Sequence, residues 1–442
     1  MSRPEALQQL ADRTPPAARS HASTADGASG GRSAVSLYRA AAILVLNAIL
    51  VLLCFEVVAS AVYKVKDFLV GSPEETLLVG EGAPREKISY YASQPWALEF
   101  WNEFRLSRKQ LRYVPFVGWR RPPFEGKLIH IDQDGIRFTP GADCRPGSYK
   151  VFAFGASTMW GTGAPDWGTI PAYLQAGLAK LKGGPVCVVN FGETAYVSTQ
   201  GVLTLMMELQ DGHVPDVAVF YDGPSDIYAA YQSGHAGGHQ NADRLAAIFE
   251  RRDRAHPLLE WAQRSASFSL INSAIVKSGI AKPSAERVAA STARERNTRA
   301  LRDGIVETYL GNYMLVSALA EKHHFDFFFF WQPFISVGDK RLTSEEQEIR
   351  KESDADVAYT ELVRSVYGAI AETTKSHKHL HDMAHAFDGH DGLLWIDNAH
   401  VTPPGNEVLA GRMLEIVTAR SSAADSRGLV VAGVGDHRRL KH

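Results

Sequence analysis

Runs of apolar residues alternate with polar stretches along the chain, and the longest run lies near the N-terminus. It covers residues 40–62, 23 positions in which Asn47, Glu56 and Ser60 are the only polar interruptions. As a helix with a rise of about 1.5 Å per residue it would extend roughly 35 Å, enough to cross the hydrocarbon core of a bilayer. We therefore expect a transmembrane helix over residues 40–63, with the lipid bilayer as its partner.

Two other interpretations of this run are a buried core helix and a cleaved signal peptide. The Ala-Ser-Ala sequence at 59–61 resembles a cleavage site, but the run starts late and exceeds the roughly 7–15 apolar residues of a signal core. A retained anchor is therefore favoured. Arg32 and Arg39 before the run balance Lys64 and Lys66 after it. The positive-inside rule therefore favours one orientation of the helix only weakly. We place the tail in the cytoplasm and the main part outside it, in the periplasm.

The regions flanking this helix differ in composition. Residues 1–39 are rich in Pro, Ser, Ala and Gly and are expected to form a disordered tail. Residues 64–147 are aromatic and mixed, with helical spacing over Trp96–Leu111 and turn-rich short strands from Gly118 onward. In this accessory segment, Trp119–Arg121 forms either a sugar-stacking surface or, as we favour, a packing contact with the main domain. Residues 421–442 are expected to be a C-terminal tail.

From Lys150 onward, the sequence consists of short apolar runs separated by stretches with helical spacing. Each run ends in Gly, Asp or Pro, and the runs have little polar alternation, which indicates strands buried on both faces of a parallel sheet between helices. The predicted strands are 150–155, 186–192, 216–223, 325–333 and 393–397, and the clearest helices are Ile170–Leu181, Thr199–Leu209 and Arg299–Lys322. Residues 231–292 exceed one crossover and are expected to be a helical insertion, either a lid or a docking element.

Composition and charge exclude several classes of protein. There are 47 Lys and Arg against 49 Asp and Glu, a net charge of −2, so a strongly basic nucleic-acid binder is not expected. Three cysteines without a CxxC pair exclude a disulfide scaffold and a cysteine-rich metal site. Cys54 lies in the apolar run, so Cys144 and Cys187 are the only plausible disulfide, and whether they pair is left open. No nucleotide-binding glycine pattern follows a strand, so no cofactor is expected.

Polar residues stand where the predicted strands end, and ligand sites of such sheets form at that edge. Ser157, in FGAST, occupies a strand-to-helix turn, where its hydroxyl is exposed near backbone N–H groups. Gly192 ends the second strand as either an oxyanion donor through its N–H or a plain turn glycine. The third strand runs into YDGPSD, which holds Ser225 and Asp226, and the fourth ends at Gln332. Gln332 and Asp226 are the candidate substrate contacts.

A serine nucleophile needs a base, and histidine needs a carboxylate to fix its tautomer. Asp-x-x-His occurs three times, at Asp253/His256, Asp382/His385 and Asp397/His400. Only Asp397/His400 directly follows a buried-strand pattern, so only this pair is expected at the carboxyl edge of the sheet. We therefore predict Ser157, His400 and Asp397 as the catalytic residues.

These blocks, in this order, resemble the SGNH/GDSL hydrolase family over about residues 148–420: FGAST, NFG, DGPSD and DNAH. The resemblance implies a three-layer α/β/α, flavodoxin-like domain with a five-stranded parallel sheet. It also implies serine-dependent ester hydrolysis or acyl transfer. The sequence VPFVGWRRPPF before this domain is similar to the membrane-anchored branch among bacterial cell-envelope and polysaccharide proteins.

One position departs from the family pattern. The third block normally reads Gly-x-Asn-Asp, and its Asn side chain donates to the oxyanion, whereas this chain has Ser225. Loss of one such donor costs about 10²–10³ in rate. The oxyanion hole is then expected to consist of the N–H groups of Ser157 and Gly192, with help from the Ser225 hydroxyl. Ala195 replaces a later glycine of the second block, which we treat as minor.

Five histidines cluster between residues 377 and 390. His381 and His385 are four apart and would share one face of a helix, as metal ligands do. Lys378, Asp382 and Asp391 interleave with them, which is equally typical of a solvated face. We therefore assign no metal ligands.

The sequence favours an anchored serine esterase or O-acyltransferase that acts outside the cytoplasm on acyl groups, such as acetyl, of a saccharide. A second hypothesis is a weakened or inactive member of the same fold with a glycan-binding or assembly role. A third is a membrane scaffold whose helix and 231–292 insertion bind envelope or polysaccharide-assembly proteins.

Overall fold

The computed structural model describes residues 29–70, 85–243, 245–246, 265 and 298–432. The predicted N-terminal tail up to residue 28 and most of the 231–292 insertion lie outside these ranges. The chain divides into two compact units, residues 1–65 with 261–273, and residues 66–260 with 274–442.

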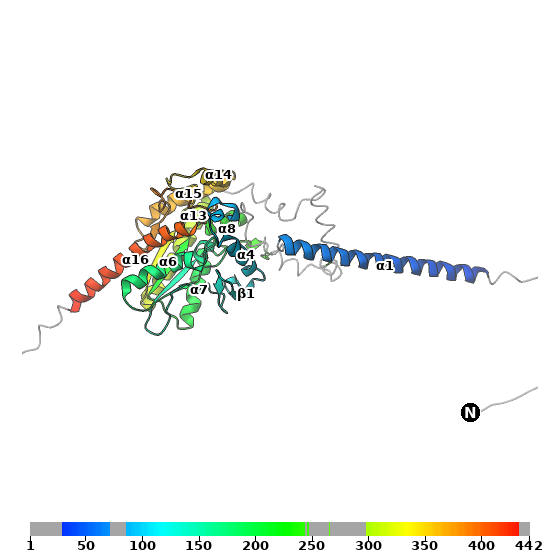
Figure 1. Cartoon of the computed structure of the whole chain (residues 1–442), viewed down its shortest axis with the longest axis horizontal. Coiled ribbons are helices and arrows are strands. Elements are labelled where there is room, and N and C mark those ends of the chain that lie inside the picture. The colour runs from blue at the N-terminus through cyan, green and yellow to red at the C-terminus, as the bar shows by residue number, and fades with distance from the viewer. Residues whose placement is uncertain (1–28, 71–84, 244, 247–264, 266–297, 433–442) are drawn as a thin grey trace, which may run out of the picture. The chain divides into compact units, whose positions relative to one another are not determined.

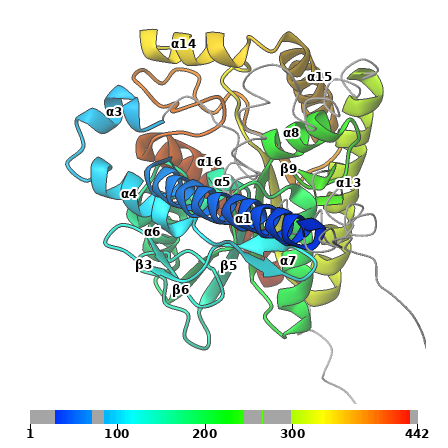
Figure 2. The same cartoon turned by 90° about the vertical axis from the view of Figure 1, so that its right-hand side faces the viewer.

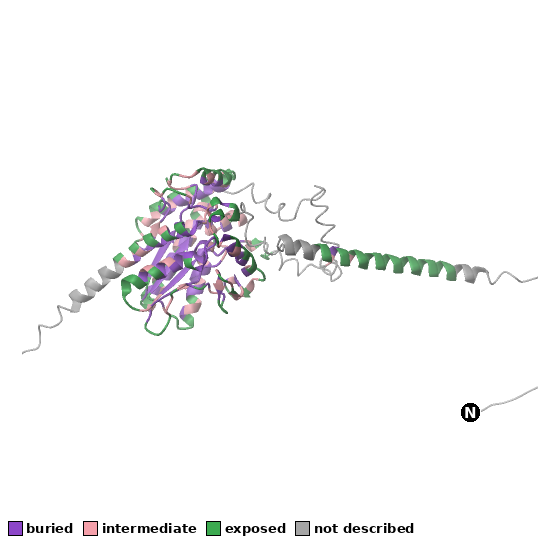
Figure 3. Cartoon of the chain, viewed as in Figure 1, coloured by how far each residue is buried: buried purple, intermediate pink, exposed green. Residues whose placement is uncertain are grey.

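The first unit is dominated by the long apolar helix α1 (Ser29–Val70). Within it, Val35–Val62 has a mean hydropathy of 2.7 and is long and apolar enough to cross a membrane. None of its 18-residue apolar window is buried inside the structure, unlike a core helix of a soluble domain (Figure 3). In the same unit, Ser265 donates a hydrogen bond of 2.7 Å to the Glu56 carboxylate.

The second unit contains the predicted sheet (Figure 1). Its five strands run parallel in the order β6-β5-β7-β8-β9. Their bounds are β5 (Tyr149–Gly155), β6 (Val186–Asn190), β7 (Val217–Asp222), β8 (Asp326–Trp331) and β9 (Leu380–Asp382). Both neighbours of β5 in the sheet, β6 on one side and β7 on the other, follow it in the chain. The carboxyl end of β5 is therefore a switch point, the place where such folds bind ligands. The predicted flavodoxin-like fold class is confirmed.

Helices cover both faces of this sheet. The strands alternate between two cores, so Val151 and Ala153 of β5 pack in one and Phe152 and Phe154 pack in the other. The helices of the first face are α6 (Ile170–Lys182) and α16 (Pro403–Ala432), and those of the second are α7 (Ser198–Gln210), α8 (Pro224–Ser233), α13 (Thr298–His323) and α15 (Val357–Thr374). Figure 2 shows the two groups of helices on opposite sides of the sheet.

The fifth strand is not the predicted one. Residues 393–397 were expected to be a strand, but β9 at 380–382 pairs with β8 instead, while Trp395 only bridges to Val401. The run is apolar because Leu394 and Trp395 are buried, and the Glu346 carboxylate accepts their N–H groups at 2.9 and 3.1 Å. A side chain therefore takes the place of a neighbouring strand, and hydrophobicity alone does not distinguish a buried loop from a strand.

The segment before β5 is built into the same domain. Helix α4 (Ala97–Ser107) places Phe100, Trp101 and Phe104 in the core of the first sheet face. It is followed by the hairpin of β1 (Arg112–Val114) and β2 (Gly118–Arg120). Of the two interpretations of Trp119–Arg121, packing is the observed one, since Trp119 and Arg121 are buried.

The remaining short elements are also defined in the structure. They are η1 (Arg85–Lys87), α3 (Ser89–Ala92), β3 (Phe124–Glu125), β4 (His130–Ile131), α5 (Ser157–Trp160), η2 (Asp166–Gly168) and α14 (Ser344–Ser353). The question left open for the cysteines is answered, because Cys144 and Cys187 form a disulfide. The bond ties the chain before β5 to the edge strand β6.

Candidate active site

The nucleophile candidate stands at a sharp turn after β5. Ser157 is the first residue of α5, directly beyond the carboxyl end of the strand. A side chain at Gly155 would place its Cβ 2.4 Å from the Tyr221 carbonyl oxygen, so this close approach of β5 to β7 requires glycine. The N–H of Ser157 lies in the first turn of the helix, where no intrahelical acceptor exists.

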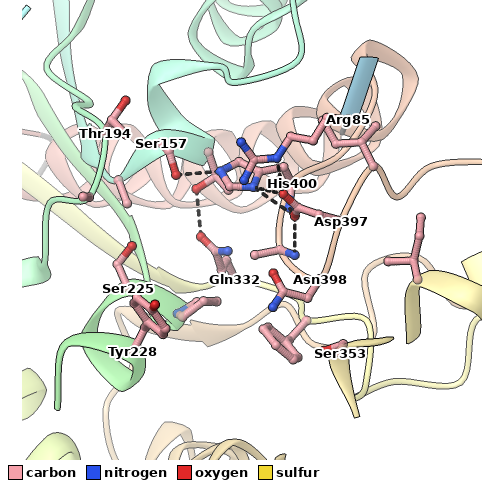
Figure 4. Close-up of a pocket in the computed structure, with 18 of the residues that line it drawn as sticks. Arg85, Ser157, Thr194, Ser225, Tyr228, Gln332, Ser353, Asp397, Asn398 and His400 are labelled. Atoms are coloured by element: carbon pink, nitrogen blue, oxygen red, sulfur yellow. Dashed lines mark hydrogen bonds and ion pairs between the residues drawn. The ribbon is translucent and has the colours of Figure 1, made fainter. Parts of the chain in front are cut away.

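Three predicted residues meet at this turn. Ser157 Oγ lies 2.6 Å from Nε2 of His400. On the other side of the ring, Nδ1 lies 2.9 and 2.7 Å from the two carboxylate oxygens of Asp397. The arrangement places a hydroxyl, a base and a carboxylate in series, as proton transfer from a serine requires (Figure 4).

The buried setting of His400 favours its neutral form. Burial lowers its pKa and so does the Arg85 guanidinium, while Asp397 acts in the opposite direction. Burial opposes ionisation of Asp397, but Arg85 and His400 outweigh it and hold the pKa of that carboxyl well below its usual range. A neutral imidazole oriented by a charged carboxylate is the state needed for a general base.

Arg85 was missed by the sequence reasoning. Its Nε donates to Oδ2 of Asp397, although the two residues are 312 positions apart. No local pattern around Arg85 distinguishes it from other arginines of the accessory segment.

The structure corrects the predicted role of Gly192. Its N–H donates to the Asn190 side chain at 3.0 Å, and a Cβ there would lie 2.4 Å from the Trp160 nitrogen. Ala195 lines the cavity instead, and its backbone is in the left-handed region with φ of +65°. Within the described ranges its N–H donates to no protein atom. The signal was present in the sequence as the substituted glycine of the second block, which was set aside.

A buried arginine holds the loop that carries Ala195. Arg121 donates from Nη2 to Thr194 Oγ1 at 2.7 Å and from its backbone N–H to Glu193 at 2.9 Å. Burial lowers the pKa of Arg121 to about 9, against the opposing charge of Glu193, so it stays a cation at neutral pH. The WRRPPF stretch therefore supports the loop beside Ser157 from inside the domain.

A cavity of about 420 Å³ opens in front of Ser157. Ser225 and Tyr228 line it from α8, and Glu352 and Ser353 line it from α14, which no sequence pattern had indicated. Figure 4 shows Gln332 and Asn398 between the triad and these residues. The remaining lining residues are Arg85, Ala156, Thr158, Thr194, Ala195, Pro224, Gln240, Phe334, Ile349, Tyr359, Ile396 and Ala399.

The two candidate substrate contacts differ in position. Gln332 lines the cavity and is 2% exposed. Its Oε1 accepts a hydrogen bond of 2.8 Å from Thr158 Oγ1, which leaves its amide hydrogens for other partners. Asp226 is not among the described lining residues. Its carboxylate instead accepts from the N–H and hydroxyl of Ser198, at 3.0 and 2.5 Å.

The other histidine candidates lie apart from this site. His381 belongs to β9 and stacks on Phe330, with ring centroids 5.3 Å apart, so the predicted helical face shared with His385 was wrong. His385 pairs with Asp388 at 2.7 Å, and with Asp339 these two form an exposed group of side chains. Asp253 and His256 lie outside the described residues.

Comparison with known proteins gives matches among solved structures. No protein-family model and no curated protein matches the chain. A member of the lipolytic G-D-S-L family from Veillonella parvula aligns over 61% of this chain and 98% of its own, with 12% identity and a TM-score of 0.32. An acetylxylan esterase from Geobacillus stearothermophilus aligns over 61% and 95%, with 15% identity and a TM-score of 0.28. A lipase/acylhydrolase from Enterococcus faecalis aligns over 61% and 96%, with 15% identity and a TM-score of 0.31.

Proposed function

We propose that this chain is a membrane-anchored serine esterase or O-acyltransferase that acts on acetyl esters of a saccharide outside the cytoplasm. The observation that carries the proposal is the continuous hydrogen-bonded series from Ser157 through His400 to Asp397 at the wall of an open cavity.

The reaction proceeds in two halves. Ser157 Oγ attacks the ester carbonyl carbon while its proton passes to Nε2 of His400, and Asp397 stabilises the resulting imidazolium. The tetrahedral intermediate collapses, the bond to the sugar oxygen breaks, and His400 returns its proton to that oxygen. The acyl-serine is then attacked by water or a second sugar hydroxyl, whose proton His400 accepts. The second intermediate collapses, the bond between the acyl carbon and Ser157 Oγ breaks, and His400 returns the proton to Oγ. Hydrolysis and transfer differ only in this second acceptor.

The negative charge on the carbonyl oxygen needs donors placed in advance. Ser157, Ala195 and Ser225 line the cavity, so the candidate donors are the backbone N–H groups of Ser157 and Ala195 and the Ser225 hydroxyl. A serine hydroxyl is shorter than the expected Asn amide, so we propose that the two backbone groups supply most of the stabilisation.

The saccharide assignment is supported by the chemistry of the cavity wall. Gln332, Asn398 and Ser353 offer amide and hydroxyl groups, and Tyr228 adds an aromatic ring with a hydroxyl. Such groups match the hydroxyl-rich alcohol part of an acylated sugar. The volume of about 420 Å³ suits a short acyl group together with a sugar unit.

The location is supported by two separate features. Helix α1 provides an apolar stretch of membrane-spanning length, and the Cys144–Cys187 disulfide belongs to oxidising compartments such as the bacterial periplasm. Both fit a domain that works outside the cytoplasm beside its membrane.

An alternative function is glycan binding by a lapsed catalyst. The observation that favours it is Ser225, which lies where the family's Asn would donate to the oxyanion. In that case the polar cavity would hold a saccharide without turnover.

A fluorophosphonate probe on the full chain in detergent separates these possibilities. Peptide mass mapping should find the adduct on Ser157, and the adduct should disappear in His400→Ala. Ser353→Ala, which changes another serine of the same cavity, is the matched control and should label normally. A folded chain that never forms the adduct would contradict catalysis and favour glycan binding.

Transfer is tested separately by product analysis with an acetylated donor and an acceptor glycan. An acetylated acceptor supports transfer. If only free acetate ever appears, the transferase half of the proposal is wrong and hydrolysis stands.

A further inference from the structure

The acid and base of the triad lie on a loop outside the sheet, between β9 and α16. Two backbone bonds shape this loop, from Ile396 N–H to His400 O and from Ile335 N–H to Asn398 O, both 3.0 Å. The Asp397 Oδ1 atom accepts the N–H groups of Ala399 and His400. These contacts fix the backbone turn, but they leave the Oδ2 side of the carboxylate to other partners.

Arg85 supplies a partner on that side. Its Nε donates to Oδ2, the same oxygen that lies 2.7 Å from Nδ1 of His400. The two side chains are 16% and 12% exposed, so the ion pair is largely shielded from water. A charge-assisted bond in this setting holds the carboxylate in one rotamer more firmly than a bond to water would.

Arg85 is itself held in place by the segment that carries it. Ser89 donates its N–H to Glu345 of α14 at 2.9 Å, and the Tyr91 hydroxyl donates to Gly163 O at 2.7 Å, in the loop that follows α5. The segment is thus tied to α14 and to the loop that follows α5, and Arg85 near its start contacts Asp397.

We propose that Arg85 is a positioning residue for the Asp397–His400 pair, contributed by the stretch that leads from the apolar helix into the domain. This inference rests on the proposed function. It means that the proposed catalytic centre is complete only when the accessory segment is present, because that segment supplies the Arg85 partner of Asp397 Oδ2.

The charge of Arg85 gives this role a measurable signature. The charged groups around His400 are Asp397 on its own loop, Arg85 on η1 and Glu352, which lines the same cavity from α14. Arg85 opposes protonation of His400, and it also stabilises the ionised form of Asp397. Removing the cation therefore raises the pKa of His400, and the neutral base is lost at a higher pH than in the wild type.

The test uses the full chain in detergent with Arg85→Gln, Arg85→Lys and a control, Arg105→Gln. Arg105 lies in the same segment but is half exposed and pairs with Glu86. The rate of fluorophosphonate labelling of Ser157 is measured against pH. For Arg85→Gln we expect a loss of up to about a hundredfold and an acid limb displaced to higher pH. Arg85→Lys should keep the wild-type acid limb, and Arg105→Gln should match the wild type throughout.

A second measurement does not depend on catalysis. Diethyl pyrocarbonate modifies neutral imidazole, so the pH midpoint for modification of His400, read by peptide mass, should also move upward in Arg85→Gln. Unchanged midpoints in both measurements would overturn the inference. A wild type that resists the fluorophosphonate while the His400 midpoint still moves would overturn the proposed function and support the position assigned to Arg85.

Discussion

The guanidinium carbon of Arg121 lies 3.5 Å from the centre of the Trp160 ring, and that of Arg137 lies 4.1 Å from the same ring. Both arginines are buried, and both come from the segment before β5. Arg137 donates to the carbonyls of Trp160, Gly161 and Ala164, while Arg121 holds Glu193 and Thr194. The Trp160 ring therefore contacts both Arg137, which holds the turn after Ser157, and Arg121, which holds the loop of Ala195.

Arg121→Met removes the cation of this arrangement and leaves the Glu193 carboxylate buried without its partner. Breaking a buried ion pair in this way costs about 3–5 kcal/mol, so the free energy of unfolding should fall by about that amount in urea titrations. Arg105→Met, a half-exposed arginine, should change it by no more than about 0.5 kcal/mol. Equal effects of the two substitutions would show that the buried pair contributes nothing specific.

Ser225→Asn restores the amide that the third block usually supplies. If the oxyanion hole lacks one donor, the amide should raise kcat/KM toward an acetylated sugar by about tenfold or more, since a full donor is worth about 10²–10³. Ser353→Asn introduces the same side chain elsewhere in the cavity and should not raise the rate. A Ser225→Asn enzyme no faster than wild type would mean that the hydroxyl, or the backbone alone, already suffices.

Gly192→Ala and Ala195→Gly distinguish the two positions of the second block. A Cβ at 192 would press on the backbone of α5, which should destabilise the fold by about 1–3 kcal/mol. At 195 the backbone is already left-handed, so glycine should leave the free energy of unfolding unchanged or raise it by up to about 1 kcal/mol. The opposite ranking in thermal or urea unfolding would refute this assignment.

Asp222 and Asp226 give the fold a pH dependence. Burial raises the pKa of Asp222 well above its ordinary value and that of Asp226 to about 6. Because the folded-state values are raised, the protonated pair stabilises the fold below about pH 4, and this contribution is lost as the pH rises through about 6. Asp222→Asn should therefore gain stability relative to wild type as the pH rises from about 4 through about 6. Asp326→Asn, which changes an exposed carboxylate, is the control, and its free energy of unfolding should vary with pH as that of the wild type does.

The fold was largely predictable because both faces of the sheet are covered. Strands such as β7 and β8 are buried almost throughout, so they appear in the sequence as unbroken apolar runs. Residues 393–397 have the same appearance for a different reason, since Glu346 satisfies their backbone. Local hydrophobicity reports burial, and it does not report which group accepts the hydrogen bonds.

The site was predictable only where residue type determines the chemistry. Ser157, His400 and Asp397 were proposed from residue type and chain order, and the structure brings them together. The strand expected before Asp397 is a loop, and it is Asp382 that ends β9. The Gly192 assignment was wrong because the direction of an N–H depends on backbone angles, and Ala195 reaches the left-handed region despite its side chain. Arg85 was missed because its partner is 312 positions away, and no local pattern encodes a contact of that range.

The Cys144–Cys187 bond has a consequence for the integrity of the chain. It closes a covalent ring with a sequence separation of 43, and β5, Ser157 and α6 all lie inside it. A protease that cuts once at the exposed Gly183–Gly184 turn would leave two pieces linked through sulfur. Such a nicked chain would migrate as one species on a gel until a thiol is added. Ser157 would stay joined to β5 through the peptide backbone and to β6 through the disulfide.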